Sequence, residues 1–229
     1  MPNAFQLLYA AIVDDERAKV KELLDQDPNL TQRGVGEVSC YESKIAHWIY
    51  SGDTVLHLAA AGFRVEIARM LLVAGADASS AKNRRCSQPL HYASDGYLDG
   101  PSWNPRGQVA MIRLLLKAGS KIDAQDKNGA TPLHRAVRTR CTSAVKCLLD
   151  AGADPAIRNK PGSTPFHLAV QNTGRGGSGS EMARTAQREI LQVFLDRGVR
   201  PTLMDAKGKS VMDWARSDWI AKLLGHRSA

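Results

Sequence analysis

Four histidines recur at equivalent places in the sequence and are the first residues that could do chemistry. They stand in the phrases Thr54-Val-Leu-His57, Gln88-Pro-Leu-His91, Thr131-Pro-Leu-His134 and Thr164-Pro-Phe-His167. A zinc site needs about four ligands within roughly 2.0–2.3 Å of one ion. Sharing a repeated position does not gather the histidines around one ion, and Cys40 with His47 supplies only a single pair of ligands. We therefore predict that the chain holds no metal or other cofactor.

Two short segments superficially resemble phosphate-binding loops. Gly174-Arg-Gly-Gly-Ser-Gly-Ser180 is rich in glycine but lacks the spacing of a P-loop, and no strand pattern precedes it. Gly208-Lys209-Ser210 has the end of that motif, but Leu203 stands where its first glycine belongs. We interpret the first segment as a flexible insert and the second as a turn. No motif of a hydrolase or metalloprotease is present, so the sequence predicts a protein that is not an enzyme.

The histidine phrase has the chemistry of a helix start. Threonine at the N-cap accepts from a free backbone N–H, proline fits the first helical position, and histidine at the third reaches back to the cap. A second phrase, Leu-Leu-x-Ala-Gly, follows the first three helix starts, and Phe194-Leu-Asp-Arg-Gly198 follows the fourth. It is typical of a helix end, where glycine adopts the left-handed conformation. His134 and His167 lie 33 residues apart. Units of two short helices bury their apolar faces only by stacking on one another.

The repeated phrases resemble ankyrin repeats over nearly the whole chain. The resemblance implies an all-α solenoid of stacked antiparallel helix pairs, joined by short β-hairpin fingers, with a concave recognition face made by the fingers and inner helices. It also implies that Asp126 and Asp205 brace their fingers. We expect one domain over residues 1–229. Its parts are an N-terminal capping repeat with an extended connector (1–51), a repeat (52–81), a repeat with an insert (82–124), a repeat (125–157), a repeat with an insert (158–204) and a C-terminal capping repeat (205–229).

Three segments depart from the plain repeat. From histidine to glycine a plain unit spans 18 residues, but His91 to Gly119 spans 28 and His167 to Gly198 spans 31. Such inserts map to loops, often at a binding edge, although tolerated surface loops would give the same pattern. We expect the second insert to be mobile. The connector between Pro28 and Thr54 is also long, and an extended hairpin and an extra helical turn both fit it.

Composition limits the class of partner. The chain has 229 residues, 43% of them hydrophobic, and a formal net charge of +8. A basic balance favours acidic partners. The four cysteines are too sparse for a disulfide scaffold, the apolar start is interpreted as an amphipathic helix, and no apolar run approaches the ~18 residues of a membrane span. We expect a cytoplasmic monomer that does not bind membranes.

The basic residues gather on the predicted fingers, where neighbouring units would join them into a positive ridge. We predict a protein-binding scaffold whose basic ridge faces an acidic protein and whose aromatic side chains, Tyr41 among them, act as anchors. The alternatives are binding of nucleic acid or another anionic ligand through the same ridge, and a merely solvated row of charges. The predicted partner-binding residues are Trp48, Tyr50, Arg84, Arg85, Tyr92, Trp103, Lys127, Arg135, Arg138, Arg158, Lys160 and Lys207.

Overall fold

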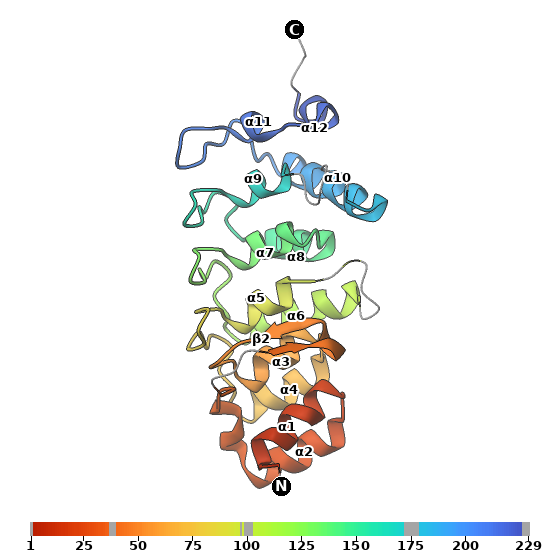
Figure 1. The fold of residues 1–229 in the computed structure, drawn as a ribbon, viewed down its shortest axis with the longest axis vertical. Coiled ribbons are helices and arrows are strands. Elements are labelled where there is room, and N and C mark those ends of the chain that lie inside the picture. The colour runs from red at the N-terminus through yellow and green to blue at the C-terminus, as the bar shows by residue number, and fades with distance from the viewer. Residues whose placement is uncertain (1, 37–39, 97, 99–102, 172–178, 226–229) are drawn as a thin grey trace.

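The protein consists of helix pairs that follow one another in chain order along one direction (Figure 1). The computed structural model describes residues 2–36, 40–96, 98, 103–171 and 179–225. The pairs are α1 (Ala4–Val13) with α2 (Arg17–Gln26), α3 (Val55–Ala61) with α4 (Val65–Val73), α5 (Pro89–Ser94) with α6 (Pro105–Lys117), α7 (Pro132–Arg138) with α8 (Thr142–Asp150), α9 (Pro165–Ala169) with α10 (Glu181–Asp196), and α11 (Val211–Trp214) with α12 (Asp218–Leu223). The predicted helical repeat architecture is confirmed.

The histidine phrase starts an inner helix in each of the four units, as predicted. In α7, the Thr131 backbone N–H donates to His134 Nδ1 over 3.2 Å, and the opposite ring nitrogen, Nε2, lies 3.0 Å from the Ser163 carbonyl of the next unit. His57, His91 and His167 make the same pair of contacts. An accepting Nδ1 and a donating Nε2 describe a neutral imidazole, so each histidine caps its own helix and ties it to the following finger.

The fingers are tight turns rather than regular hairpins. Asp126 N–H donates to the Ala130 carbonyl over 2.9 Å, and the Asp126 carboxylate accepts the backbone N–H groups of Asn128 and Ala130. Asp205 braces its own turn in the same way. Because side-chain oxygens satisfy these amides, no further strand pairing is required. Within the described residues, the only regular sheet is the antiparallel pair β1 (Cys40–Glu42) and β2 (His47–Ile49), which lies in the connector.

Successive fingers are joined to one another by backbone hydrogen bonds. Lys127 N–H donates to the Arg85 carbonyl over 2.8 Å, Lys160 N–H to Asn128 over 2.9 Å, and Ala206 N–H to Gly162 over 2.9 Å. Gly129 makes one of these approaches feasible, because a Cβ there would lie 2.8 Å from the Lys160 nitrogen. The fingers consequently form one continuous row along the same side of the stack (Figure 1).

The connector contains both of the structures that its sequence allowed. A 3-10 helix, η1 (Pro28–Gln32), follows α2, and the β1–β2 hairpin turns through a second 3-10 segment, η2 (Ser43–Ile45). Ile45 and Ile49 are buried and fix the hairpin to the stack, whereas Tyr41 and Trp48 remain about half exposed. In the part of the chain that the structure describes, no helix combines the length and apolar character needed to cross a membrane.

Candidate functional site

A cavity of about 340 Å³ lies where the β1–β2 hairpin meets three successive units. We call it the hairpin pocket. The hairpin forms one wall of the pocket, and the ends of α3 and α5 form a second wall. Trp103 of the first insert forms a third wall, and α7 forms the floor. The pocket therefore joins both the connector and the first insert, the two departures from the plain repeat that lie in the N-terminal half.

Aromatic side chains form much of this pocket. The rings of Tyr41 and Trp48 pair edge to face with centroids 5.8 Å apart, since the two residues are directly opposite in the hairpin register. Tyr50 follows β2 and lies under the Arg85 guanidinium, 5.1 Å from its ring centroid. Trp103 packs on Gly96, where an added Cβ would lie only 2.3 Å from the indole ring.

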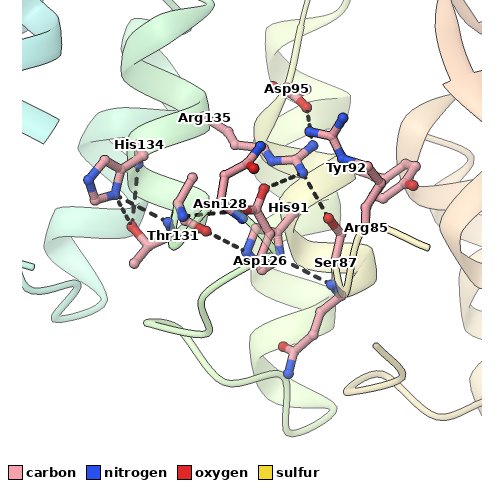
Figure 2. Close-up of polar contacts among 12 residues, drawn as sticks. Arg85, Ser87, His91, Tyr92, Asp95, Asp126, Asn128, Thr131, His134 and Arg135 are labelled. Atoms are coloured by element: carbon pink, nitrogen blue, oxygen red, sulfur yellow. Dashed lines mark hydrogen bonds and ion pairs between the residues drawn. The ribbon is translucent and has the colours of Figure 1, made fainter. Parts of the chain in front are cut away.

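A buried ionic network lies beneath the aromatic walls. Figure 2 shows the Arg135 guanidinium between Asp95, Asp126 and Ser87. Arg135 Nη1 donates to Asp95 over 2.8 Å, and Nη2 donates to Asp126 over 2.7 Å and to Ser87 over 2.8 Å. Arg135 comes from α7, Asp95 follows α5, and Asp126 braces the finger that precedes α7. One cation thus fixes the pocket floor to a finger.

Arg135 and its neighbours set the charge state of the two carboxyl groups. Burial is the largest single effect and would raise the pKa of Asp95, but Arg135 together with His47 and Arg138 outweighs it and holds the pKa far below its usual range. Burial and the Arg135 guanidinium also oppose each other at Asp126, and the net effect lowers its pKa. Both groups are consequently carboxylates near neutral pH, and the Arg135–Asp95–Asp126 cluster carries a net negative charge of one.

Two further side chains approach Asp95 from the pocket side. His47 Nε2 lies 3.5 Å from Asp95 Oδ2, and Arg138 Nη2 lies 3.6 Å from Oδ1. Asp95 Oδ1 is buried and accepts no hydrogen bond from the described residues. The Arg138 side chain is 58% exposed, so its guanidinium is held loosely at the opening of the pocket.

The predicted binding residues divide into three groups. Arg84, Lys127, Arg158, Lys160 and Lys207 are exposed along the row of fingers. Trp48, Tyr50, Arg85, Trp103 and Arg138 come together at the hairpin pocket. The remaining two, Tyr92 and Arg135, are buried.

Tyr92 and Arg135 are therefore corrections to the sequence prediction. The Tyr92 hydroxyl donates to the buried Asp53 carboxylate at 2.8 Å, and its ring packs 4.6 Å from the His47 ring. The Arg135 side chain is 5% exposed and is occupied by the ionic network. Each residue directly follows the capping histidine of a short inner helix, and a buried carboxylate, Asp53 for Tyr92 and Asp95 for Arg135, satisfies its polar group there. Tyr92 lies behind the pocket, and Arg135 lines its floor with a side chain already committed to the ionic network.

Sequence reasoning did not identify Asp95, His47 or Gly96 as part of this site. Asp95 and Gly96 stand at the point where the first insert begins, and only the folded hairpin brings His47 to them. A usable signal was present in the insert itself, because an acidic residue and a glycine directly after the helix Pro89–Ser94 break the repeat pattern.

The second insert is described only at its edges. Residues 172–178, which include Arg175 and most of the glycine-rich segment, lie outside the described residues. Arg140 holds both flanks, donating to the Ala183 carbonyl over 2.8 Å and to the Gln171 carbonyl over 3.2 Å. Ser180 caps α10 through its hydroxyl. Arg140 is thus a structural arginine at the base of this insert.

No group of three or more His, Cys, Asp or Glu side chains among the described residues could hold a metal ion. Both ring nitrogens of each histidine at a helix start already make hydrogen bonds within the stack. Burial lowers the pKa values of His57 and His134, which is consistent with their neutral state.

Comparison with protein families identifies the repeats. A model of three ankyrin repeats matches residues 104–205, and a model of the single ankyrin repeat matches residues 51–84. Together the two matches cover more than half of the chain. A search of curated proteins found no match. Proteins built from these repeats generally bind other proteins and are typically non-enzymatic. The histidine-capped helix starts, the hydrogen-bonded fingers and these matches lead to one conclusion: the chain belongs to the ankyrin repeat family.

Proposed function

We propose that this protein is a non-enzymatic scaffold that binds an acidic protein through its fingers and the adjoining inner helices. The observation that carries the proposal is the row of hydrogen-bonded fingers, which brings basic residues from successive units side by side. The basic residues of the row are Lys82, Arg84, Arg85, Lys127, Arg158, Lys160, Lys207 and Lys209. We further propose that the protein acts as a monomer in the cytoplasm.

The acidic groups of the fingers do not cancel this charge at the surface. Asp126 and Asp205 are buried and direct their oxygens at the turn amides. The lysines of the same turns remain exposed. A surface of one sign accelerates encounter with a partner of the opposite sign and discriminates against partners of like charge.

A protein partner is favoured over nucleic acid by the distribution of aromatic side chains. Proteins that bind single strands interleave stacking aromatics with basic residues along the binding groove. Here the exposed aromatic rings cluster at one end, in the hairpin pocket, and the finger turns after it carry none. Such a separation of anchor and charge suits a protein interface, in which a few aromatic and arginine side chains carry most of the binding energy.

The test is the double variant Arg84→Glu with Lys127→Glu. The control is Lys117→Glu with Lys146→Glu, which makes the same change in net charge on the exposed parts of the outer helices α6 and α8. Binding partners are first recovered from source lysate with and without nuclease. Association is then measured with purified partner, generic duplex and single-stranded DNA over a range of salt concentrations.

We expect the finger variant to slow association with the protein partner while the outer-helix control associates normally. The salt dependence should be modest. Tight binding of the wild type to DNA at physiological salt, lost in the finger variant, would refute the proposal. The binding constant for duplex DNA would then fall with salt at a log–log slope of about 0.9 for each phosphate contacted.

A further inference from the structure

The hairpin pocket has a chemistry that the row of fingers lacks, since it combines aromatic walls with arginines. Its volume of about 340 Å³ is enough for one large side chain with adjoining backbone. We propose that the hairpin pocket anchors a partner segment in which a large aromatic side chain stands beside aspartate or glutamate. This inference rests on the proposed function, because it names the feature by which an acidic partner would be recognised.

The walls of the pocket select an aromatic side chain. Tyr41 and Trp48 are 52% and 51% exposed, although they already form an edge-to-face pair. Tyr50 and Trp103 are partly buried and complete the apolar lining. An aromatic ring that entered the pocket would cover exposed ring surface and gain the offset or edge contacts that such rings prefer.

The charges of the pocket select an acidic neighbour for that ring. Three guanidinium groups, those of Arg85, Arg135 and Arg138, line the pocket with the single carboxylate of Asp95. Asp95 is already matched by Arg135 at 2.8 Å. The Arg85 guanidinium makes no hydrogen bond or ion pair within the described residues, and Arg138 is only 3.6 Å from Asp95 without a hydrogen bond. Both arginines therefore have donors for a carboxylate, which they would bind in bidentate fashion.

The same charges disfavour a basic residue in the pocket. A lysine or arginine in the pocket would meet the guanidinium groups of Arg85 and Arg138, whereas Asp95 is already paired with Arg135. Like charges placed together at an interface cost binding free energy. The pocket is thus not a cage for a cationic side chain, although its walls are aromatic.

Several groups are held in place before any partner arrives. Gly96 lets Trp103 pack closely, the Tyr50 ring lies under Arg85, and Arg135 fixes Asp95 from beneath. A preorganised site loses less conformational entropy on binding than a flexible one. This ordering suits the pocket to recognise a short extended segment.

The probe is a library of short random peptides, selected on the intact protein. The most enriched peptide is then synthesised with a fluorescent label and titrated against wild type and variants. We expect enrichment of an aromatic residue next to Asp or Glu. Arg138→Glu and Trp48→Ser should each weaken binding by about tenfold or more, which corresponds to the loss of roughly 1.4 kcal/mol.

Matched controls are available on the outer helix α4. Arg69→Glu makes the same charge change as Arg138→Glu, and each arginine side chain is 58% exposed. Val73→Ser removes an apolar side chain that is 91% exposed. Both controls should bind the peptide as the wild type does. Gly96→Ala adds a third arm that removes no lining side chain. Its Cβ would lie 2.3 Å from the Trp103 ring and 2.6 Å from the buried Cys141 Sγ, so Trp103 must shift and binding should weaken.

The outcomes separate this inference from the proposed function. Acidic peptides that lack an aromatic residue, and that bind through Arg84 and Lys127 alone, would overturn the inference and leave the proposed function intact. Basic peptides would overturn both. Absence of any enriched motif, or aromatic–acidic peptides unaffected by all three pocket variants, would also overturn the inference. Circular dichroism and thermal melting of each variant verify that a loss of binding is not a loss of fold.

Discussion

Replacement of Arg135 by methionine should destabilise the protein by about 3–5 kcal/mol, the usual effect of removing one partner from a buried ion pair. The guanidinium makes three hydrogen bonds of 2.7–2.8 Å, and its side chain is 5% exposed. Methionine keeps much of the volume but leaves the Asp95 and Asp126 carboxylates buried without their cation. Because domains of this kind are stable by only about 5–15 kcal/mol, the loss is a large fraction of the total.

The pH dependence of Arg135→Met gives the sharper test. In the wild type, the folded pKa values of Asp95 and Asp126 lie below the unfolded ones. Their stabilisation is therefore complete above about pH 4 and is lost as pH falls through the folded values. In the variant, burial is no longer opposed by Arg135, so both folded pKa values rise and protonation at mildly acidic pH relieves the defect. The difference in unfolding free energy between wild type and variant should shrink as pH falls from about 7 to about 4.5.

Urea unfolding followed by circular dichroism measures this difference at each pH. The triple variant that adds Asp95→Asn and Asp126→Asn should recover most of the lost stability, because asparagine still accepts the backbone N–H groups of the finger turn. It also keeps the test available if the single variant does not fold. A loss below about 1 kcal/mol, with no change in the difference across that pH range, would show that the network does not act as described.

Two further outcomes concern the stack itself. Burial and the nearby Arg135 lower the pKa of His91 to about 4, so below about pH 6.5 this residue takes up a proton in the unfolded chain but not in the folded one. His91 alone should therefore account for a loss of about 2 kcal/mol of stability between pH 7 and pH 5. Urea unfolding of His91→Gln should lack that share of the pH dependence, and an unchanged dependence would contradict the assignment. Gly129→Ala should lower the melting temperature more than Gly152→Ala: both glycines have positive φ, but only the first would place a Cβ 2.8 Å from a backbone nitrogen. Equal losses would show that the close approach between fingers is unimportant.

Local chemistry was sufficient to predict the repeated parts of the fold. The helix starts, the glycine-terminated helices and the braced turns each depend on residues a few positions apart, such as Thr131 with His134. The basic fingers were predictable for the same reason, since every unit repeats its geometry. In such a stack, units that follow one another in the sequence also lie next to one another in space, so their relative placement was predictable too.

The candidate site was only partly predictable, because it is built from the segments that break the repeat. The aromatic and arginine composition of the pocket was anticipated from Trp48, Tyr50, Arg85, Trp103 and Arg138. Nothing local indicates that the hairpin folds back over α5, which places His47 beside Asp95. The burial of Tyr92 and Arg135 was missed for a related reason, since both partner residues, Asp53 and Asp95, lie about one repeat earlier in the chain.

The row of backbone bonds between fingers has a mechanical consequence. Each bond is 2.8–2.9 Å long and joins turns that are braced by their own hydrogen bonds, so we expect the finger side of the stack to keep a nearly fixed length. The outer helices lack such backbone bonds to one another among the described residues, and the turns that follow α4 and α6 are joined by a side-chain bond from Ser120 to the Ala78 carbonyl. A force that bends the molecule would therefore change the distances between neighbouring outer helices more than the distances between neighbouring fingers. The spacing of the finger charges would stay constant as the overall curvature changed.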